Sequence, residues 1–268
     1  MTMFREKRVL QLLNLLTPFI AGAITLVLGG GGSWEDVFVD QSVTKLLSPA
    51  PITFAIWGPI FFLLGLFYFY QARDLFPGQE EVEMIFLRQV NVFFLLSTVM
   101  ATVWFVIWAQ RMIWGSVFAM IFYLLTILAA YFRLGINLQK RPPGERLFVT
   151  SGWSMYAGWV FVATLVNTTT GLAYTGFENL PFTELQWTVA GTIVAVLIYL
   201  LFLFLRRDYI FVSVGIWALI GVGLTHLNPV PPSNFSVLLI SFIGAVILMI
   251  STILHYIITP HQDTPKWI

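Results

Sequence analysis

The most regular pattern of chemically distinctive side chains in this sequence lies between residues 152 and 167. Gly152, Tyr156, Trp159, Ala163 and Asn167 recur at spacings of four, three, four and four residues, which places them on one face of an α-helix. The two aromatic rings could stack on a flat apolar ligand while the amide anchors its polar edge. The same face could instead pack closely against another helix through one interhelical hydrogen bond. The sequence leaves both interpretations open.

Tryptophan is unusually frequent, with ten residues in the chain. Indole rings commonly settle at the membrane interface, and this explanation suits the tryptophans near the predicted helix ends: Trp108, Trp114, Trp153 and Trp187. It does not suit those that are predicted to lie deeper: Trp57, Trp104, Trp159 and Trp217. We therefore expect these four to contact another side chain or a ligand.

Residues that could support enzymatic chemistry are few. The chain has no cysteine, so thiolate nucleophiles, thiolate metal sites and disulfides are excluded. No Asp, Glu, Lys or Arg lies in the middle of a predicted span, although such charges usually mark ion coupling or proton relays. His226 and His255 are predicted near opposite membrane faces and cannot share a metal ion. We expect a protein without catalytic residues, metal or resident cofactor.

The elements that must position these residues are transmembrane helices. Hydrophobic residues make up 58% of the chain and charged residues 10%, with a mean hydropathy of +0.85, which excludes an ordinary water-soluble monomer. A span of the bilayer core needs about 20 apolar residues. Eight such runs are present: Val9 to Leu28, Ile52 to Gln71, Val90 to Gln110, Ile113 to Phe132, Phe148 to Thr169, Leu185 to Leu205, Tyr209 to His226 and Phe235 to Ile257. We predict an all-α integral membrane protein with about eight helices.

The positive charges predict the orientation of these spans. All but two of the 14 lysines and arginines fall in alternate connecting segments, and the exceptions are Lys45 and Arg111. Because cytoplasmic segments retain positive charge, both termini are predicted to be cytoplasmic, in a plasma membrane of bacterial type. The net charge of +1 gives no indication of a nucleic-acid partner. The first run could also be a signal peptide, but its apolar stretch to Leu28 is long for a cleaved segment.

Two stretches resemble the translocator protein or tryptophan-rich sensory protein family (TspO/MBR). Pro51-Ile52-Thr53-Phe54-Ala55-Ile56-Trp57-Gly58-Pro59 resembles the Pro- and Trp-rich entry into the family's second helix. Met155-Tyr156-Ala157-Gly158-Trp159-Val160-Phe161-Val162-Ala163-Thr164-Leu165-Val166-Asn167 is similar to its fifth-helix pattern. The chain departs from the pattern in the third helix, where the family usually has Asn three residues before a Trp and this sequence has Ala101 before Trp104.

The resemblance implies a domain organisation. Residues 1–176 would form a TspO-like bundle of five helices with an external loop at residues 29–51. Residues 177–268 would add three transmembrane helices and a short cytoplasmic tail, whose role the resemblance does not indicate. By itself, the loop could be either a flexible connector or a lid over an external pocket, and Trp34 is the candidate lid residue.

The resemblance also implies a ligand site. Members of this family are associated with binding porphyrins and other tetrapyrroles, sterols and flat aromatic drugs among the five helices. Carried over to this sequence, the ligand-binding candidates are Trp57, Trp104, Tyr156, Trp159, Ala163 and Asn167. The tryptophans would supply ring contacts, Ala163 would leave room, and Asn167 would offer hydrogen bonds. A porphyrin would then be a ligand rather than a cofactor.

Three functional hypotheses follow. The first is a receptor- or carrier-like membrane protein that binds a hydrophobic small molecule and acts in sensing, transport or regulation. The second is a transporter driven by the gradient of its substrate, and the third is a scaffold that packs against another membrane subunit. The expected partners are the lipid bilayer and the small-molecule ligand, with a homodimer as a candidate assembly and no nucleic acid.

Overall fold

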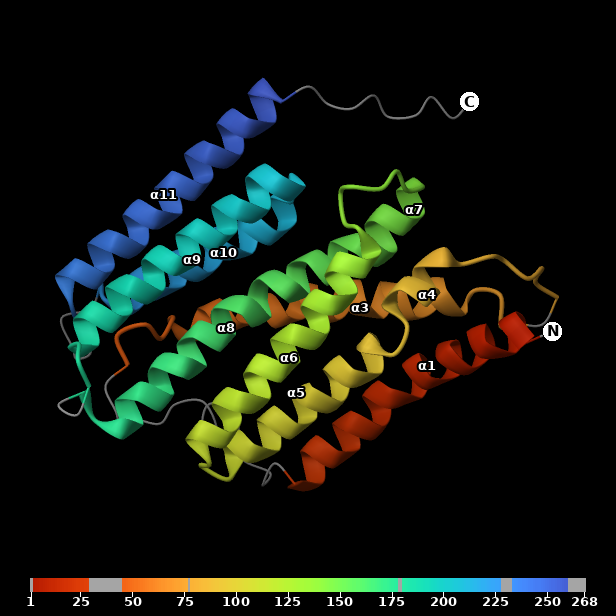
Figure 1. Cartoon of the computed structure of the whole chain (residues 1–268), viewed down its shortest axis with the longest axis horizontal. Coiled ribbons are helices and arrows are strands. Elements are labelled where there is room, and N and C mark those ends of the chain that lie inside the picture. Colours follow the sequence, from red (N-terminus) through yellow and green to blue (C-terminus); the bar gives the residue numbers. More distant parts are fainter. Residues whose placement is uncertain (1, 29–44, 77, 178–179, 228–232, 260–268) are drawn as a thin grey trace.

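The computed structural model describes residues 2–28, 45–76, 78–177, 180–227 and 233–259, and in this part of the chain every regular element is helical (Figure 1). The helices are α1 (Thr2–Leu28), η1 (Pro51–Ile56), α3 (Trp57–Ala72), α4 (Ile85–Val90), α5 (Phe93–Ala109), α6 (Ile113–Leu134), α7 (Pro143–Glu145), η2 (Arg146–Thr150), α8 (Ser151–Thr175), α9 (Glu184–Arg206), α10 (Tyr209–Thr225) and α11 (Phe235–Ile258). η1 is a 3₁₀ turn and η2 a π-helical turn.

The eight predicted spans correspond to helices of the structure. Six helical segments are long and apolar enough to cross a membrane, and α5 and α10 are two shorter apolar helices. The third predicted run is divided: α4 ends at Val90, and Asn91 has a positive φ of 47° before α5 begins at Phe93. The predicted all-helical membrane fold is confirmed, with the start of this span corrected to a short helix and a break.

The helices form two groups that meet along α8 (Figure 1). In the first group α5 packs on α6 and α1, and α3 and α6 pack on α8. In the second group α9, α10 and α11 pack on one another, and α10 also packs on α8 and η1. The segment Pro143–Thr175, most of which is α8, is consequently the most enclosed of the six long apolar segments, with 67% of its most apolar 18 residues buried. The predicted domain boundary at residue 176, between a five-helix bundle and three additional helices, stays a prediction.

Small residues allow close contacts between α8 and the second group of helices and within that second group. A Cβ placed on Gly158 of α8 would lie 3.1 Å from the carbonyl oxygen of Phe211 in α10. A Cβ on Gly215 would lie 2.5 Å from the ring of Tyr199 in α9, and the Tyr199 hydroxyl donates a 2.8 Å hydrogen bond to the Gly158 carbonyl. Small side chains at helix contacts are the usual means of close packing in membranes. Here they join α8, α9 and α10.

At one end of the bundle, α1 is tied to the segment after α3 by a charged network. Lys7 forms an ion pair with Asp74, and Gln11 donates hydrogen bonds to the Asp74 carboxylate (2.7 Å) and to the Gln71 carbonyl (2.6 Å). Burial alone would raise the pKa of Asp74, but the bonds from Lys7, Gln11 and the Val82 amide outweigh it, so its pKa lies below the usual value. We call this end, where the arginine-rich segments also lie, the basic end.

At the opposite end, the described residues before α3 are held by the second group of helices. The Leu46 amide donates to Glu184 (2.8 Å), and the Leu46 carbonyl lies 2.8 Å from Nε2 of His226. Further along, the Ala50 amide donates to the Gly221 carbonyl (2.9 Å), and Nε1 of Trp217 donates to the Thr53 carbonyl (2.8 Å). Helices α9 and α10 therefore fix the backbone that leads into Trp57.

We expect Gly215→Ala to destabilise the protein. The added methyl group would meet a Tyr199 ring that is fully buried and anchored by its hydroxyl, and such overpacking typically costs about 1–3 kcal/mol. The measurement is the thermal unfolding midpoint in detergent. Gly65→Ala is the matched control, because a Cβ there has no neighbour within 4 Å. An equal midpoint for both variants would contradict the tight α9–α10 contact.

Candidate ligand-binding site

The predicted face of α8 is turned into the protein. Tyr156, Trp159 and Asn167 are buried, with Trp159 2% and Asn167 4% exposed. Ala163 is partly buried, one turn from each of the latter two. Trp57 opens α3 and Trp104 lies in α5, both partly buried. All six predicted residues thus lie on three helices of the first group.

Aromatic rings form the first part of this site. The Trp159 ring contacts those of Phe54 and Trp57 edge-on, with centroid distances of 5.7 and 6.2 Å. Trp57 also contacts Tyr156 at 6.4 Å and stacks on Phe61 at 5.2 Å. We call these five residues the aromatic cluster. Phe54 and Phe61 were not among the predicted site residues, although Phe54 lies in the Pro- and Trp-rich stretch and Phe61 follows it by two residues.

A hydrogen-bonded amide forms the second part. Nε1 of Trp104 donates a 2.6 Å bond to Oδ1 of Asn167, and Nδ2 of Asn167 donates a 3.1 Å bond to the Ser116 hydroxyl of α6. Asn167 therefore joins α5, α6 and α8. The predicted residues thus divide into two contacting sets. Trp104 contacts Asn167, and Trp57 contacts Tyr156 and Trp159. Ala163 lies between the two sets along α8. Ser116 was not predicted as part of the site.

Two indole N–H groups remain unpaired beside the aromatic cluster. In the described part of the chain, Nε1 of Trp153 and Nε1 of Trp159 are buried without a hydrogen-bond acceptor. Leaving such a donor unpaired costs about 1–3 kcal/mol. By contrast, the Tyr156 hydroxyl is hydrogen-bonded to that of Tyr123 in α6. The Trp159 N–H is thus a donor available to an acceptor atom of a ligand.

The rings of the aromatic cluster are in contact with one another. Because the Trp159 ring contacts those of Phe54 and Trp57, a ligand that stacks on Trp159 would have to separate rings that now touch. Trp34, the candidate lid residue, lies outside the described residues. Among the described residues, no group of three His, Asp or Glu side chains could hold a metal ion.

Apolar helices of this length and burial define a helical integral membrane protein. Residues 11–254 match the TSPO-like protein family, and the chain belongs to that family. The match continues through α9 and α10 into α11, well beyond residue 176, where the predicted five-helix bundle ends. No curated protein and no solved structure gives a significant match.

We expect Trp104 and Asn167 to be energetically coupled. Trp104→Phe removes the donor and Asn167→Leu removes the acceptor of the same hydrogen bond, so the two losses should not add. The expected coupling free energy is at least about 0.6 kcal/mol, the average for hydrogen bonds between membrane helices. Reversible unfolding in mixed micelles would measure it in a double-mutant cycle.

Thr168→Val supplies the control for this cycle. Within the described residues, the Thr168 hydroxyl donates to the Thr164 carbonyl of its own helix alone (2.8 Å), so the effect of Thr168→Val should add to that of Trp104→Phe. If the effects of Asn167→Leu and Trp104→Phe were equally additive, the two residues would not be energetically coupled. The hydrogen bond between Trp104 and Asn167 would then not stabilise the contact of α5 with α8.

Proposed function

We propose that this protein is a membrane receptor or carrier for a flat hydrophobic molecule of tetrapyrrole or sterol-like chemistry. The ligand would bind among α3, α5 and α8, beside the aromatic cluster. The observation that carries the proposal is Trp159, whose ring is packed edge-on between Phe54 and Trp57 while its N–H has no acceptor among the described residues. The same site could serve sensing, transport or regulation.

A flat ligand suits this cluster for physical reasons. Edge-on contacts between rings can be exchanged for stacking on a larger ring system without loss of apolar burial. A ligand carbonyl or carboxylate would also accept a bond from the Trp159 N–H, which removes the cost of the unpaired donor. Ala163 is small and lies one turn from Trp159, so it leaves room toward the Trp104–Asn167 pair.

Entry of a ligand requires a displacement, and η1 is the segment best suited to it. Phe54 lies in this 3₁₀ turn, whose hydrogen-bond geometry is poorer than that of an α-helix. A modest movement of η1 would carry the Phe54 ring away from Trp159. The bonds from Trp217 and the Ala50 amide would set how far η1 can move.

The position of the aromatic face favours a binding site over a scaffold. A face that packs against another subunit must be accessible from the lipid, whereas Tyr156, Trp159 and Asn167 are buried within one chain.

We further propose that the basic end faces the cytoplasm of a bacterial-type plasma membrane, because Lys and Arg concentrate in cytoplasmic segments.

We expect protoporphyrin IX to quench the tryptophan fluorescence of the purified protein in a saturable manner, with a Kd in the micromolar range or tighter. Trp159→Phe removes the unpaired donor, and Asn167→Ala removes the amide. Each should weaken binding by about tenfold, which corresponds to the roughly 1.4 kcal/mol of one good polar contact. Titrations corrected for inner-filter absorption give the Kd values.

Trp114→Phe is the control for the loss of one indole. Trp114 is 42% exposed at the start of α6, away from the aromatic cluster, so its variant should bind as the parent does. Absence of quenching, or an identical Kd in all four proteins, would exclude this site and favour the transporter or scaffold hypotheses.

A further inference from the structure

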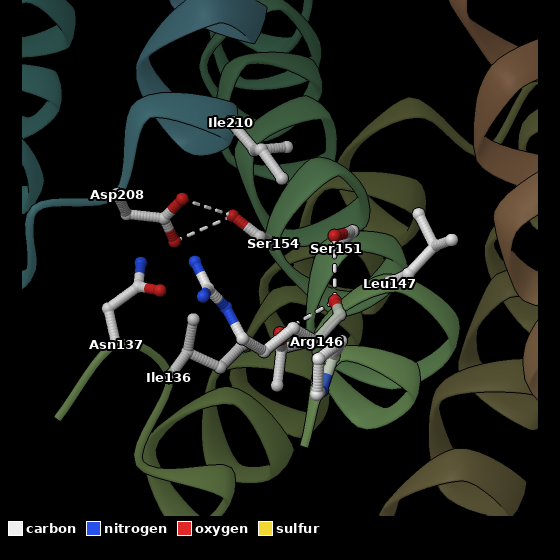
Figure 2. A pocket seen from close by; sticks show the side chains of 10 residues that line it. Ile136, Asn137, Arg146, Leu147, Ser151, Ser154, Asp208 and Ile210 are labelled. Carbon is white, nitrogen blue, oxygen red and sulfur yellow. Dashed lines mark hydrogen bonds between the residues drawn. The ribbon is translucent and has the colours of Figure 1, made fainter. Parts of the chain in front are cut away.

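A pocket lies at the basic end of the bundle, and none of the residues of the aromatic cluster lines it. It has a volume of about 300 Å³ and lies between the segment after α6, the turn η2 with the start of α8, and the start of α10 (Figure 2). Its apolar wall includes Ile136, Leu147 and Ile210, and its polar wall includes Asn137, Ser154 and Asp208. A volume of this size is at the lower limit of small-molecule sites, about 300–1,000 Å³.

Asp208 places a buried negative charge in the wall of this pocket. It is 1% exposed and caps α10, accepting a 3.0 Å bond from the Phe211 amide. Its carboxylate also accepts from the hydroxyls of Tyr131 (2.6 Å) and Ser154 (2.5 and 2.6 Å). An ionised carboxylate has about four acceptor positions, and these donors supply one proton each. One position therefore remains for a further donor.

Arg146 places a positive charge opposite. Figure 2 shows its guanidinium directed toward Asp208 and Ser154 beside the Asn137 side chain, with no hydrogen bond drawn from it. Within the described residues, the guanidinium forms no ion pair with Asp208. The Arg146 carbonyl accepts bonds from the hydroxyls of Thr150 (2.9 Å) and Ser151 (2.8 Å). These bonds stabilise the π-helical turn, a distortion that is frequent at functional sites.

The two opposite charges limit what the pocket can bind. The Asp208 carboxylate would repel a simple anion, and the Arg146 guanidinium would repel a simple cation. A molecule that carries both charges satisfies both walls, because Arg binds phosphate through paired N–H donors and a primary ammonium donates to a carboxylate. The pocket also lies where α8 and α10 begin, at the basic end of the bundle.

We propose that this pocket binds a zwitterion made of a primary ammonium and a phosphate ester, with the ammonium at Asp208 and the phosphate at Arg146. Two sources share this chemistry: the headgroup of phosphatidylethanolamine and a soluble ester of phosphoethanolamine. The proposal does not depend on the aromatic cluster, and no residue is common to the two sites.

Native mass spectrometry of the full chain in detergent tests the proposal with three probes: dioctanoyl phosphatidylethanolamine, dioctanoyl phosphatidylcholine and glycerophosphoethanolamine. We expect one ethanolamine lipid to bind at least tenfold more tightly than the choline lipid, whose trimethylated nitrogen has no N–H for Asp208. Binding of the soluble ester as tightly as the lipid would assign the soluble source, and binding of the lipid alone would assign the membrane. Equal affinity for the two lipids, with no binding of the ester, would overturn the proposal.

Three variants locate the binding. Arg146→Gln changes an exposed side chain whose guanidinium has no hydrogen bond within the described part of the chain, and it should weaken ethanolamine binding at least tenfold. Arg88→Gln removes the same charge at an exposed position outside the pocket and should have no effect. Asp208→Asn should abolish the preference for ethanolamine over choline. Because Asp208 also caps α10, Arg146→Gln is the decisive variant: unchanged binding in that protein would overturn the proposal.

Discussion

The close contact of α8 with α10 at Gly158 is the interaction on which the rest of the structure depends. The Phe211 carbonyl and Val214 side chain of α10 occupy the space that a side chain at 158 would need. This contact encloses α8 between the two groups of helices (Figure 1). An enclosed helix can carry polar groups at membrane depth, because neighbouring helices rather than lipid must satisfy them.

Helix α8 makes buried polar and aromatic contacts with its neighbours at several positions along its length. Near its start Ser154 bonds to Asp208, in its middle Tyr156 and Trp159 contact Trp57, and near its far end Asn167 accepts from Trp104. The helices α9 to α11 contribute indirectly, since Trp217 and Gly221 of α10 hold the backbone that precedes Trp57. They therefore help to position the ring that closes the aromatic cluster, although no predicted site residue lies in them.

The sequence could predict the helices and the face of α8 because both follow from local periodicity. It could also identify Asn167 as a polar group at membrane depth, but not its partner. Where the family pattern has Asn and this chain has Ala101, the amide near Trp104 comes instead from Asn167 on another helix. Asp208 was missed for a similar reason. In the sequence it is one charged residue beside Arg206 and Arg207, while its partners Tyr131 and Ser154 lie 77 and 54 residues away.

The most direct test of the account is an experimentally determined structure of the protein with protoporphyrin IX bound. We predict that the macrocycle lies against the rings of Trp57 and Trp159 in the space left by a displaced Phe54, with the Trp159 N–H directed at a ligand acceptor. A porphyrin found on the lipid-facing surface, with the Phe54, Trp57 and Trp159 rings still in contact, would contradict it.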